Sequence, residues 1–215
     1  MTYGIFIVVA HLLGSVPFAF LIARAHGKDL RTIGSGNIGA TNLARALGRR
    51  WGYICFALDV LKGFIPMVAF PAVAGRPDSP ATLALWLTVG IAAILGHVYP
   101  VTLGFKGGKG VATSFGVTLG LWPYFTIPGL VALLVWVAVV LIWRYVSLAS
   151  ICGAVAFPVA LLAGIVIVPA WTASSLWPLL IAAVAIPTMV IVRHRENVKR
   201  LIAGTESKIR DKSAK

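Results

Sequence analysis

Apolar residues fill most of the chain in windows of about 20 residues, the length at which a helix crosses a bilayer. The predicted spans are residues 3–25, 51–73, 81–101, 111–122, 124–143, 146–168 and 171–192. The pattern predicts an all-α polytopic membrane protein with seven transmembrane helices, in which residues 1–215 form a single integral-membrane domain. The fourth segment is too short for a perpendicular crossing, but a short or re-entrant helix is acceptable where protein surrounds it.

Composition supports this class. The chain is 59% hydrophobic and 12% charged, whereas soluble domains are about 25% charged. The first segment has no basic start and no clear cleavage site, so we expect it to be a retained span. The cysteines, Cys55 and Cys152, lie in apolar segments and show neither CxxC nor metal spacing, which argues against a disulfide or a zinc site.

The net charge of +13 indicates cytoplasmic loops and anionic ligands or lipids rather than nucleic acid. With seven spans, all but two of the 19 lysines and arginines fall on one side, the exceptions being Arg76 and Lys62. The positive-inside rule makes that side cytoplasmic. The N-terminus is then predicted outside and the C-terminus inside.

Residues 104–113 form a glycine- and lysine-rich stretch between two apolar segments. Glycine allows backbone N–H groups to approach an anion, Lys106 and Lys109 add charge, and the following helix turns its N-terminal dipole toward the same place. The glycines are Gly104, Gly107, Gly108 and Gly110. The stretch predicts a phosphate cradle, and a flexible loop whose lysines only set topology is the alternative.

This stretch is not a Walker P-loop. Leu103 stands where the first glycine would be, and Gly110 replaces the serine or threonine that would hold magnesium. The sequence therefore argues against nucleoside triphosphate hydrolysis.

Residues 34–45 match G-x-G-x-x-G, but a dinucleotide site needs a preceding strand and a soluble crossover unit. The stretch instead predicts a glycine-rich turn running into a short helix. Asn37, Thr41 and Arg45 recur every four residues and would share a face of that helix. Ser35 would cap the helix or bind a ligand oxygen. A plain capping loop would use similar residues, and Arg45 favours an anion site.

A third polar stretch begins at Arg193. His194 and Asn197 lie three residues apart on one predicted helical face, Gly204 is a predicted helix terminator, and Glu206 follows it. A basic tail touching acidic lipid explains the cations, but not the imidazole, amide and carboxylate beside them.

Two ionisable residues, Asp59 and Lys62, lie inside the second span, where charges are costly. Their spacing allows them to pair with each other, and a direct substrate role is the alternative. His97, at the end of the third span, is either a ligand or a helix-end histidine bonded to backbone.

The three polar stretches follow the first, third and seventh spans, so the predicted topology puts them on one face. They can then converge into one site at the boundary between water and lipid. Such a site suits a soluble anion together with the headgroup of a lipid whose tail stays in the bilayer.

These stretches resemble the three cytoplasmic motifs of the bacterial membrane-integral glycerol-3-phosphate acyltransferases, the PlsY family. The matching segments are residues 35–42, 105–113, 194–197 and 204–206, and segment number and length match as well. The resemblance implies transfer of a fatty acyl group from acyl phosphate to the 1-hydroxyl of glycerol 3-phosphate. The products are lysophosphatidic acid and phosphate, in the first step of bacterial phospholipid synthesis. It also implies that no metal or other cofactor is needed, and a location in the bacterial inner membrane with the active site on the cytoplasmic face. The acyl-phosphate-producing enzyme is a possible partner.

The resemblance also assigns roles. The residues expected to hold glycerol 3-phosphate are Ser35, Arg45, Lys109, His194 and Asn197. The residues expected to hold the acyl phosphate are Asn37 and Thr41, with backbone amides around Gly107, Gly108 and Gly110. Weaker candidates are Lys106, Lys62 and Glu206. The base is either His194, whose ordinary pKa suits the task, or the donor phosphate itself.

Acyl phosphate has a good leaving group, so direct attack by the glycerol hydroxyl needs no protein nucleophile. The HxxxxD dyad of soluble-type acyltransferases does not occur in the chain. Two other classes fit the composition, a small anion or phosphate transporter and a lipid-binding scaffold. Transporters commonly carry inverted repeats and midplane sites, whereas this chain concentrates its polar motifs on one predicted face.

Overall fold

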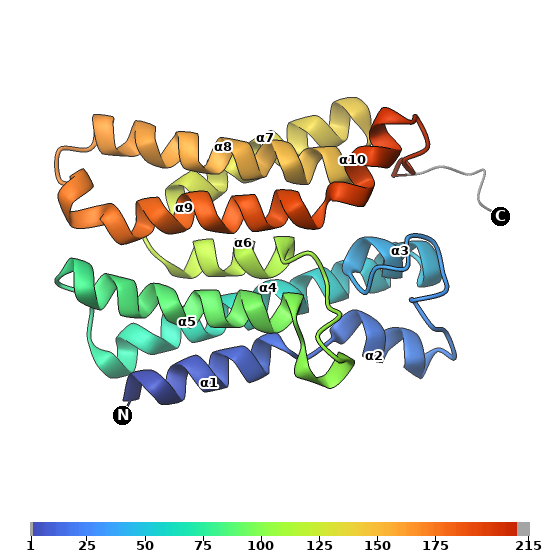
Figure 1. Cartoon of the computed structure of the whole chain (residues 1–215), viewed down its shortest axis with the longest axis horizontal. Coiled ribbons are helices and arrows are strands. Elements are labelled where there is room, and N and C mark those ends of the chain that lie inside the picture. Colours follow the sequence, from blue (N-terminus) through green and yellow to red (C-terminus); the bar gives the residue numbers. More distant parts are fainter. Residues whose placement is uncertain (1, 210–215) are drawn as a thin grey trace. The chain divides into compact units, whose positions relative to one another are not determined.

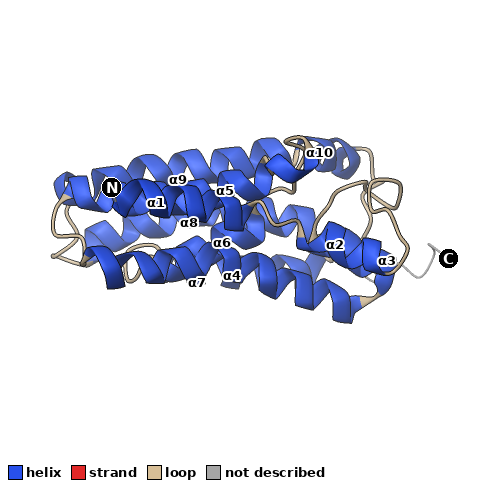
Figure 2. Cartoon of the chain, turned by 90° about the horizontal axis from the view of Figure 1, so that it is seen from below, coloured by secondary structure: helices blue, strands red, loops and turns tan. Residues whose placement is uncertain are grey.

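The computed structural model describes residues 2–209, and every regular element in that range is helical (Figure 2). Within it, six segments are long and apolar enough to cross a membrane: Tyr3–Ala25, Arg49–Ala74, Pro80–Leu103, Thr126–Trp143, Val146–Ile167 and Ala173–Arg193. These confirm the all-α, multi-pass membrane class. The predicted fourth span is a helix of ten residues, Val111–Gly120, or about 15 Å at 1.5 Å per residue. Residues 210–215, the end of the predicted basic tail, lie outside the described range.

The chain divides into two compact units, the first ending at Leu121 and the second beginning at Trp122 (Figure 1). The helices of the first unit are α1 (Thr2–Gly14), α2 (Phe18–Ala25), α3 (Ala40–Leu47), α4 (Arg49–Ala74), α5 (Pro80–Val98), the 3₁₀ turn η1 (Val101–Leu103) and α6 (Val111–Gly120). Those of the second are α7 (Thr126–Trp143), α8 (Val146–Ile167), α9 (Ala173–Arg193) and α10 (Arg195–Ile202).

Glycines bring the long helices of the first unit into close contact. A Cβ at Gly14 of α1 would collide with the backbone of α5 at Ala93, and one at Gly116 of α6 would collide with the Val60 carbonyl of α4. Small residues at such crossings allow backbones to pack closely, which drives helix association in lipid. The pairs α1–α5 and α4–α6 form the main contacts of the unit.

The predicted first span is interrupted. α1 ends at Gly14 and α2 begins at Phe18, because Pro17 has no N–H to continue the helical ladder. The carbonyl oxygens near the break are bonded from other elements: Lys62 Nζ donates to Val16 O at 3.0 Å, and Thr102 Oγ1 to Ser15 O at 3.3 Å. Broken helices are tolerated at membrane depth when neighbouring groups satisfy the exposed carbonyls in this way.

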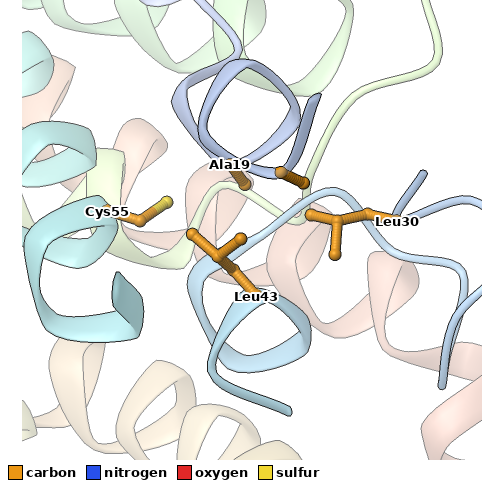
Figure 3. Close-up of a cluster of buried hydrophobic side chains, with 5 residues drawn as sticks. Ala19, Leu30, Leu43 and Cys55 are labelled. Atoms are coloured by element: carbon orange, nitrogen blue, oxygen red, sulfur yellow. The ribbon is translucent and has the colours of Figure 1, made fainter. Parts of the chain in front are cut away.

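A small apolar core fixes the segment that carries the first polar motif (Figure 3). Its buried members are Ala19 and Ala23 of α2, Leu30 of the following loop, Leu43 of α3 and Cys55 of α4. Burial of a leucine side chain contributes about 1.5–3 kcal/mol. Leu30 and Leu43 therefore anchor both ends of the segment against α2 and α4, and the glycine-rich turn between them is held in place.

In the second unit, α8 packs on both α7 and α9. The predicted boundaries of these three helices are correct to within two residues. α10 follows α9 after the single residue His194 and contacts α8 and α9.

Candidate active site

Asn42 organises the first motif. Its side chain is buried in α3 and bonds three backbone groups of the preceding turn. Nδ2 donates to Leu30 O at 3.1 Å and Ile33 O at 2.9 Å, and Oδ1 accepts from Ser35 N at 3.2 Å. Gly34 and Gly36 both have positive φ, which glycine adopts without steric cost. One amide thus closes the turn and sets the position of Ser35.

The predicted residues of this motif lie together on that turn and helix. Thr41 and Arg45 share a face of α3, with Thr41 half-buried and Arg45 exposed. Asn37 lies before the helix, whose N-cap is Gly39, so the prediction that Asn37 shares the helical face is wrong. Ser35 does not cap the helix either, and its exposed hydroxyl is available to a ligand at the surface of the turn.

The glycine-lysine loop is closed by backbone hydrogen bonds. Gly107 N donates to Val98 O and Gly108 N to His97 O, both at 3.1 Å. The expectation that these two N–H groups face an anion therefore needs correction, because both are bonded to carbonyl oxygens at the end of α5. Lys106 is exposed and Lys109 half-buried, so both lysines lie on a loop whose backbone is fixed.

With the N–H groups of Gly107 and Gly108 bonded to α5, the backbone N–H groups suited to bind an anion in this motif are those at the start of α6. Gly110 is the N-cap, with φ of 83°, and the first N–H groups of a helix have no intrahelical acceptor. The side-chain oxygens of Thr113 and Ser114, in the first turns, are buried and have no hydrogen-bond partner among residues 2–209. Because an unsatisfied buried hydroxyl is costly, this end of α6 is suited to an oxygen-rich ligand.

A buried charge cluster lies beneath the loop. Lys62 Nζ is 2.7 Å from Asp59 Oδ1, and His97 Nδ1 is 3.6 Å from the same oxygen. The pairing of Asp59 with Lys62 was predicted from their spacing and is confirmed. Lys62 is only 2% exposed and also bonds Val16 O, so its contacts are those of a structural cation. His97 faces a carboxylate, which was not predicted.

A small cavity joins this cluster to both motifs of the first unit. The residues that line it include Val16, Ile38, Lys62, His97 and Gly108. About 10 Å³ of it can hold the centre of a water molecule, roughly the room for one water. The first motif, through Ile38, and the glycine-lysine loop, through Gly108, therefore meet at one end of the first unit.

The third motif is built by the end of α10. Gly204 has φ of 68°, Thr205 N donates to Arg200 O, and Gly204 N donates to Leu201 O. This is the Schellman pattern, and the prediction that Gly204 terminates a helix is confirmed. The reversal returns the chain so that Glu206 lies beside α10.

Glu206 is the centre of a buried hydrogen-bond network. Asn197 Nδ2 donates to Oε1 at 2.6 Å, Ser147 Oγ to Oε1 at 2.8 Å and Arg200 Nε to Oε2 at 2.7 Å. Burial raises the pKa of this carboxyl, but the donors from Asn197, Ser147 and Arg200 together outweigh burial and lower it below its ordinary value. Glu206 therefore holds α10 against the start of α8.

His194 joins α9 and α10 and is 3% exposed. Its Nδ1 lies 2.7 Å from Val190 O, and since a carbonyl oxygen only accepts, Nδ1 carries the hydrogen. In the neutral ring, Nε2 is then an acceptor. The imidazole is oriented by the backbone, and its Nε2 has the character needed to accept a hydrogen bond or a proton from an alcohol.

Each unit thus carries one half of the predicted site. The first brings together Ser35, Asn37, Thr41 and Arg45 with the glycine-lysine loop, and the second brings together His194, Asn197 and Glu206. Asn42, His97, Ser147 and Arg200 were not among the predicted residues, although each contacts one of them. The one available signal for Asn42 was its amide side chain, three residues before Arg45 at the end of the first polar stretch.

Membrane-length helices that end in glycine-rich, cationic and amide-bearing loops define a multi-pass membrane protein equipped for phosphorylated ligands. The chain belongs to the glycerol-3-phosphate acyltransferase family, whose profile matches residues 4–204. It is 44% identical to the glycerol-3-phosphate acyltransferase of Aquifex aeolicus, over 93% of this chain and 95% of that one. It is 45% identical to the enzyme of the same name from Geotalea daltonii, over 94% of this chain and 95% of that one.

Two solved structures are also similar to the chain. Both are crystal structures of PlsY, an integral membrane glycerol 3-phosphate acyltransferase, one in its glycerol 3-phosphate form and one in its lysophosphatidic acid form. The first has a TM-score of 0.84 at 40% identity and the second 0.81 at 39%. Each similarity covers 97% of this chain and 96% of the other.

Proposed function

We propose that this protein transfers a fatty acyl group from acyl phosphate to the 1-hydroxyl of glycerol 3-phosphate, releasing lysophosphatidic acid and phosphate. The observation that carries the proposal is the identity of about 44% with acyltransferases of that name over nearly the whole chain. The similar structures named for glycerol 3-phosphate and lysophosphatidic acid support the acceptor and the product. Acyl phosphate as donor is consistent with a site built from N–H groups and cations.

The reaction needs two phosphate sites and an oriented hydroxyl. In the proposed arrangement Ser35, Arg45 and Lys109 hold glycerol 3-phosphate, and His194 and Asn197 complete that site. The donor phosphate is held by Thr41, Asn37 and the start of α6 after Gly110. Gly107 and Gly108 contribute by allowing the loop to pack tightly against the end of α5. The positive charge of Lys106 adds long-range attraction for the anionic substrates.

The proposed chemical step is a direct displacement. The glycerol hydroxyl oxygen attacks the acyl carbon, the bond from that carbon to the phosphate oxygen breaks, and phosphate leaves. The hydroxyl proton passes either to His194 Nε2 or to the departing phosphate. The oriented Nε2 acceptor of His194 serves both routes, because hydrogen bonding to the hydroxyl positions it for attack.

We further propose that the two units act as one acyltransferase domain in the bacterial inner membrane. In this proposal α6 is the short fourth helix of seven membrane helices, the N-terminus is outside, and all three motifs meet on the cytoplasmic face. The acyl chain of the donor stays in the bilayer, and its supply comes from an enzyme that makes acyl phosphate.

Purified protein in detergent tests the reaction directly. With acyl phosphate and labelled glycerol 3-phosphate, we expect labelled lysophosphatidic acid and an equal amount of phosphate. The same protein given acyl-CoA in place of acyl phosphate serves as the donor control. Ester formation in detergent excludes transport as the whole function, and failure to form ester from acyl phosphate would contradict the proposal.

A further inference from the structure

The buried cluster of Asp59, Lys62 and His97 has no part in the chemical step proposed above. The three side chains are 3%, 2% and 8% exposed and come from α4 and α5. Ionisable groups at such depth are costly and need a reason. Pairing explains Asp59 and Lys62, since the salt bridge of 2.7 Å leaves the pair neutral. The Asp59–Lys62 pair is already neutral, so pairing does not explain why the His97 imidazole is buried beside it.

The surroundings of His97 indicate what the ring does. Its Nδ1 edge lies 3.6 Å from the Asp59 carboxylate. Its Nε2 edge lies against Gly108, where an added Cβ would overlap Nε2 and come within 2.8 Å of Cε1. The ring therefore fills the space between a fixed carboxylate and the backbone of the glycine-lysine loop.

The loop is held to the same residue by its backbone. Gly108 N donates to His97 O at 3.1 Å, so Gly108 contacts both the carbonyl and the ring of one histidine. Gly108 does not have a positive φ, so its backbone conformation alone would accept alanine. What excludes a side chain there is the imidazole. The position of the loop thus depends on the position of that ring.

We propose that His97, oriented by Asp59, is a positioning residue for the acyl transfer, because its ring sets how close the glycine-lysine loop lies to the phosphate groups. Lys62 neutralises Asp59 and ties the cluster to the α1–α2 break through Val16 O. The inference rests on the proposed function and adds a residue to it. Displacing a phosphate-binding loop by about 1 Å is enough to lower activity by about 100-fold.

Rescue of a clash is the sharpest test. Gly108→Ala should lower kcat/KM by about 100-fold, and adding His97→Ala should restore it to the level of His97→Ala alone, because the new methyl group then has room. The matched control is Gly107→Ala, which would meet the carbonyl oxygens of His97 and Val98. Removing the ring cannot relieve that clash. If His97→Ala fails to rescue Gly108→Ala, or rescues Gly107→Ala equally well, the proposal is wrong.

A conservative variant separates positioning from folding. Asparagine at position 97 can still donate to Asp59 but does not reach Gly108. We expect His97→Asn to keep its melting temperature to within about 3 °C, the scale of 1 kcal/mol for a chain of this size. We expect KM for acyl phosphate to rise about tenfold with a smaller change in kcat. Unchanged KM and kcat would overturn the proposal, as would a loss of activity fully matched by a loss of folded protein.

A readout that needs no catalysis keeps this inference distinct from the proposed function. Lys106 lies on the loop and is exposed, so trypsin cleavage after it reports how firmly the loop is held. We expect faster cleavage in His97→Asn than in the wild type, with cleavage after Lys199 of α10, in the second unit, unchanged. If the wild type makes no lysophosphatidic acid, the proposed function fails, while the cleavage rates still decide whether His97 positions the loop.

Discussion

Replacing Glu206 by glutamine tests whether the third motif is held by one buried carboxylate. Oε1 accepts from Asn197 and Ser147, and Oε2 accepts from Arg200. A glutamine amide must turn its NH₂ group toward one of these two sides, so at least one donor there would face another donor. The neutral variant also loses the charge that Arg200 now meets.

The magnitude follows from these contacts. Hydrogen bonds to a charged group contribute about 1.5–3 kcal/mol each, and a buried donor left unsatisfied costs about 1–3 kcal/mol. The Arg200 side chain is 36% exposed, so solvent screens its share. We expect Glu206→Gln to lower the free energy of unfolding by about 2–4 kcal/mol and to raise KM for glycerol 3-phosphate, because a neutral amide holds Asn197 less firmly than the carboxylate does.

The assay combines thermal unfolding in detergent with steady-state kinetics. Glu196→Gln is the matched control, because Glu196 lies on α10, the helix that Glu206 bonds, but is exposed and pairs with the exposed cations Arg195 and Lys199. Such pairs contribute about 0–1 kcal/mol. Wild-type melting temperature and KM in Glu206→Gln would refute the reasoning.

The same carboxylate predicts a pH dependence with a definite sign. The pKa of Glu206 lies below its ordinary value of 4.5, so the folded state binds the proton less readily than the unfolded state. The stabilisation is fully present above about pH 4.5 and is lost as the pH falls through the lower folded-state pKa. Glu206→Gln lacks this component. Below pH 4.5 its stability should therefore fall less steeply than that of the wild type.

Three further predictions follow from the site. His194→Gln should retain measurable turnover with a raised KM for glycerol 3-phosphate, and complete loss of kcat with unchanged binding would assign the base to His194 instead. Asn42→Ala removes three hydrogen bonds and should lower the free energy of unfolding by about 2–4 kcal/mol. A wild-type melting curve for this variant would show that Asn42 does not hold the first motif in place. Lys62→Met removes the cation that lies 2.7 Å from the buried Asp59 carboxylate, so it should cost about 3–5 kcal/mol, and adding Asp59→Asn should recover part of this in the same melting experiment.

The membrane helices were predictable because a bilayer imposes their length and apolarity on the sequence. The same rule made α6 ambiguous, since a helix of about 15 Å cannot be assigned by length alone. Pro17 was evident in the sequence, but the sequence did not show that the helix would be interrupted there. Whether a proline bends or ends a membrane helix depends on which groups satisfy the freed carbonyls, here Lys62 and Thr102 from elsewhere in the chain.

The sequence allowed the motifs to be predicted as loops, but not the hydrogen bonds that fix the conformation of each loop. Glycine content indicated tight turns at Gly34, Gly36 and Gly204, and each has a positive φ. The hydrogen bonds of Gly107 and Gly108 to the end of α5 depend on how the loop folds back, which spacing does not encode. Bonds between distant residues, such as Ser147 with Glu206, also have no signature in local sequence.

The central proposal is that the three motif regions all lie on the cytoplasmic side of the membrane. In a variant without Cys55 and Cys152, single cysteines can replace exposed residues of each motif region: Thr32, Lys106 and Glu196. Cysteine at Arg76, in the loop between α4 and α5, is the control for the opposite face. In intact cells, a membrane-impermeant maleimide should label position 76 and none of the other three, and inverted vesicles should reverse the pattern. Labelling of any motif position from outside would contradict the account.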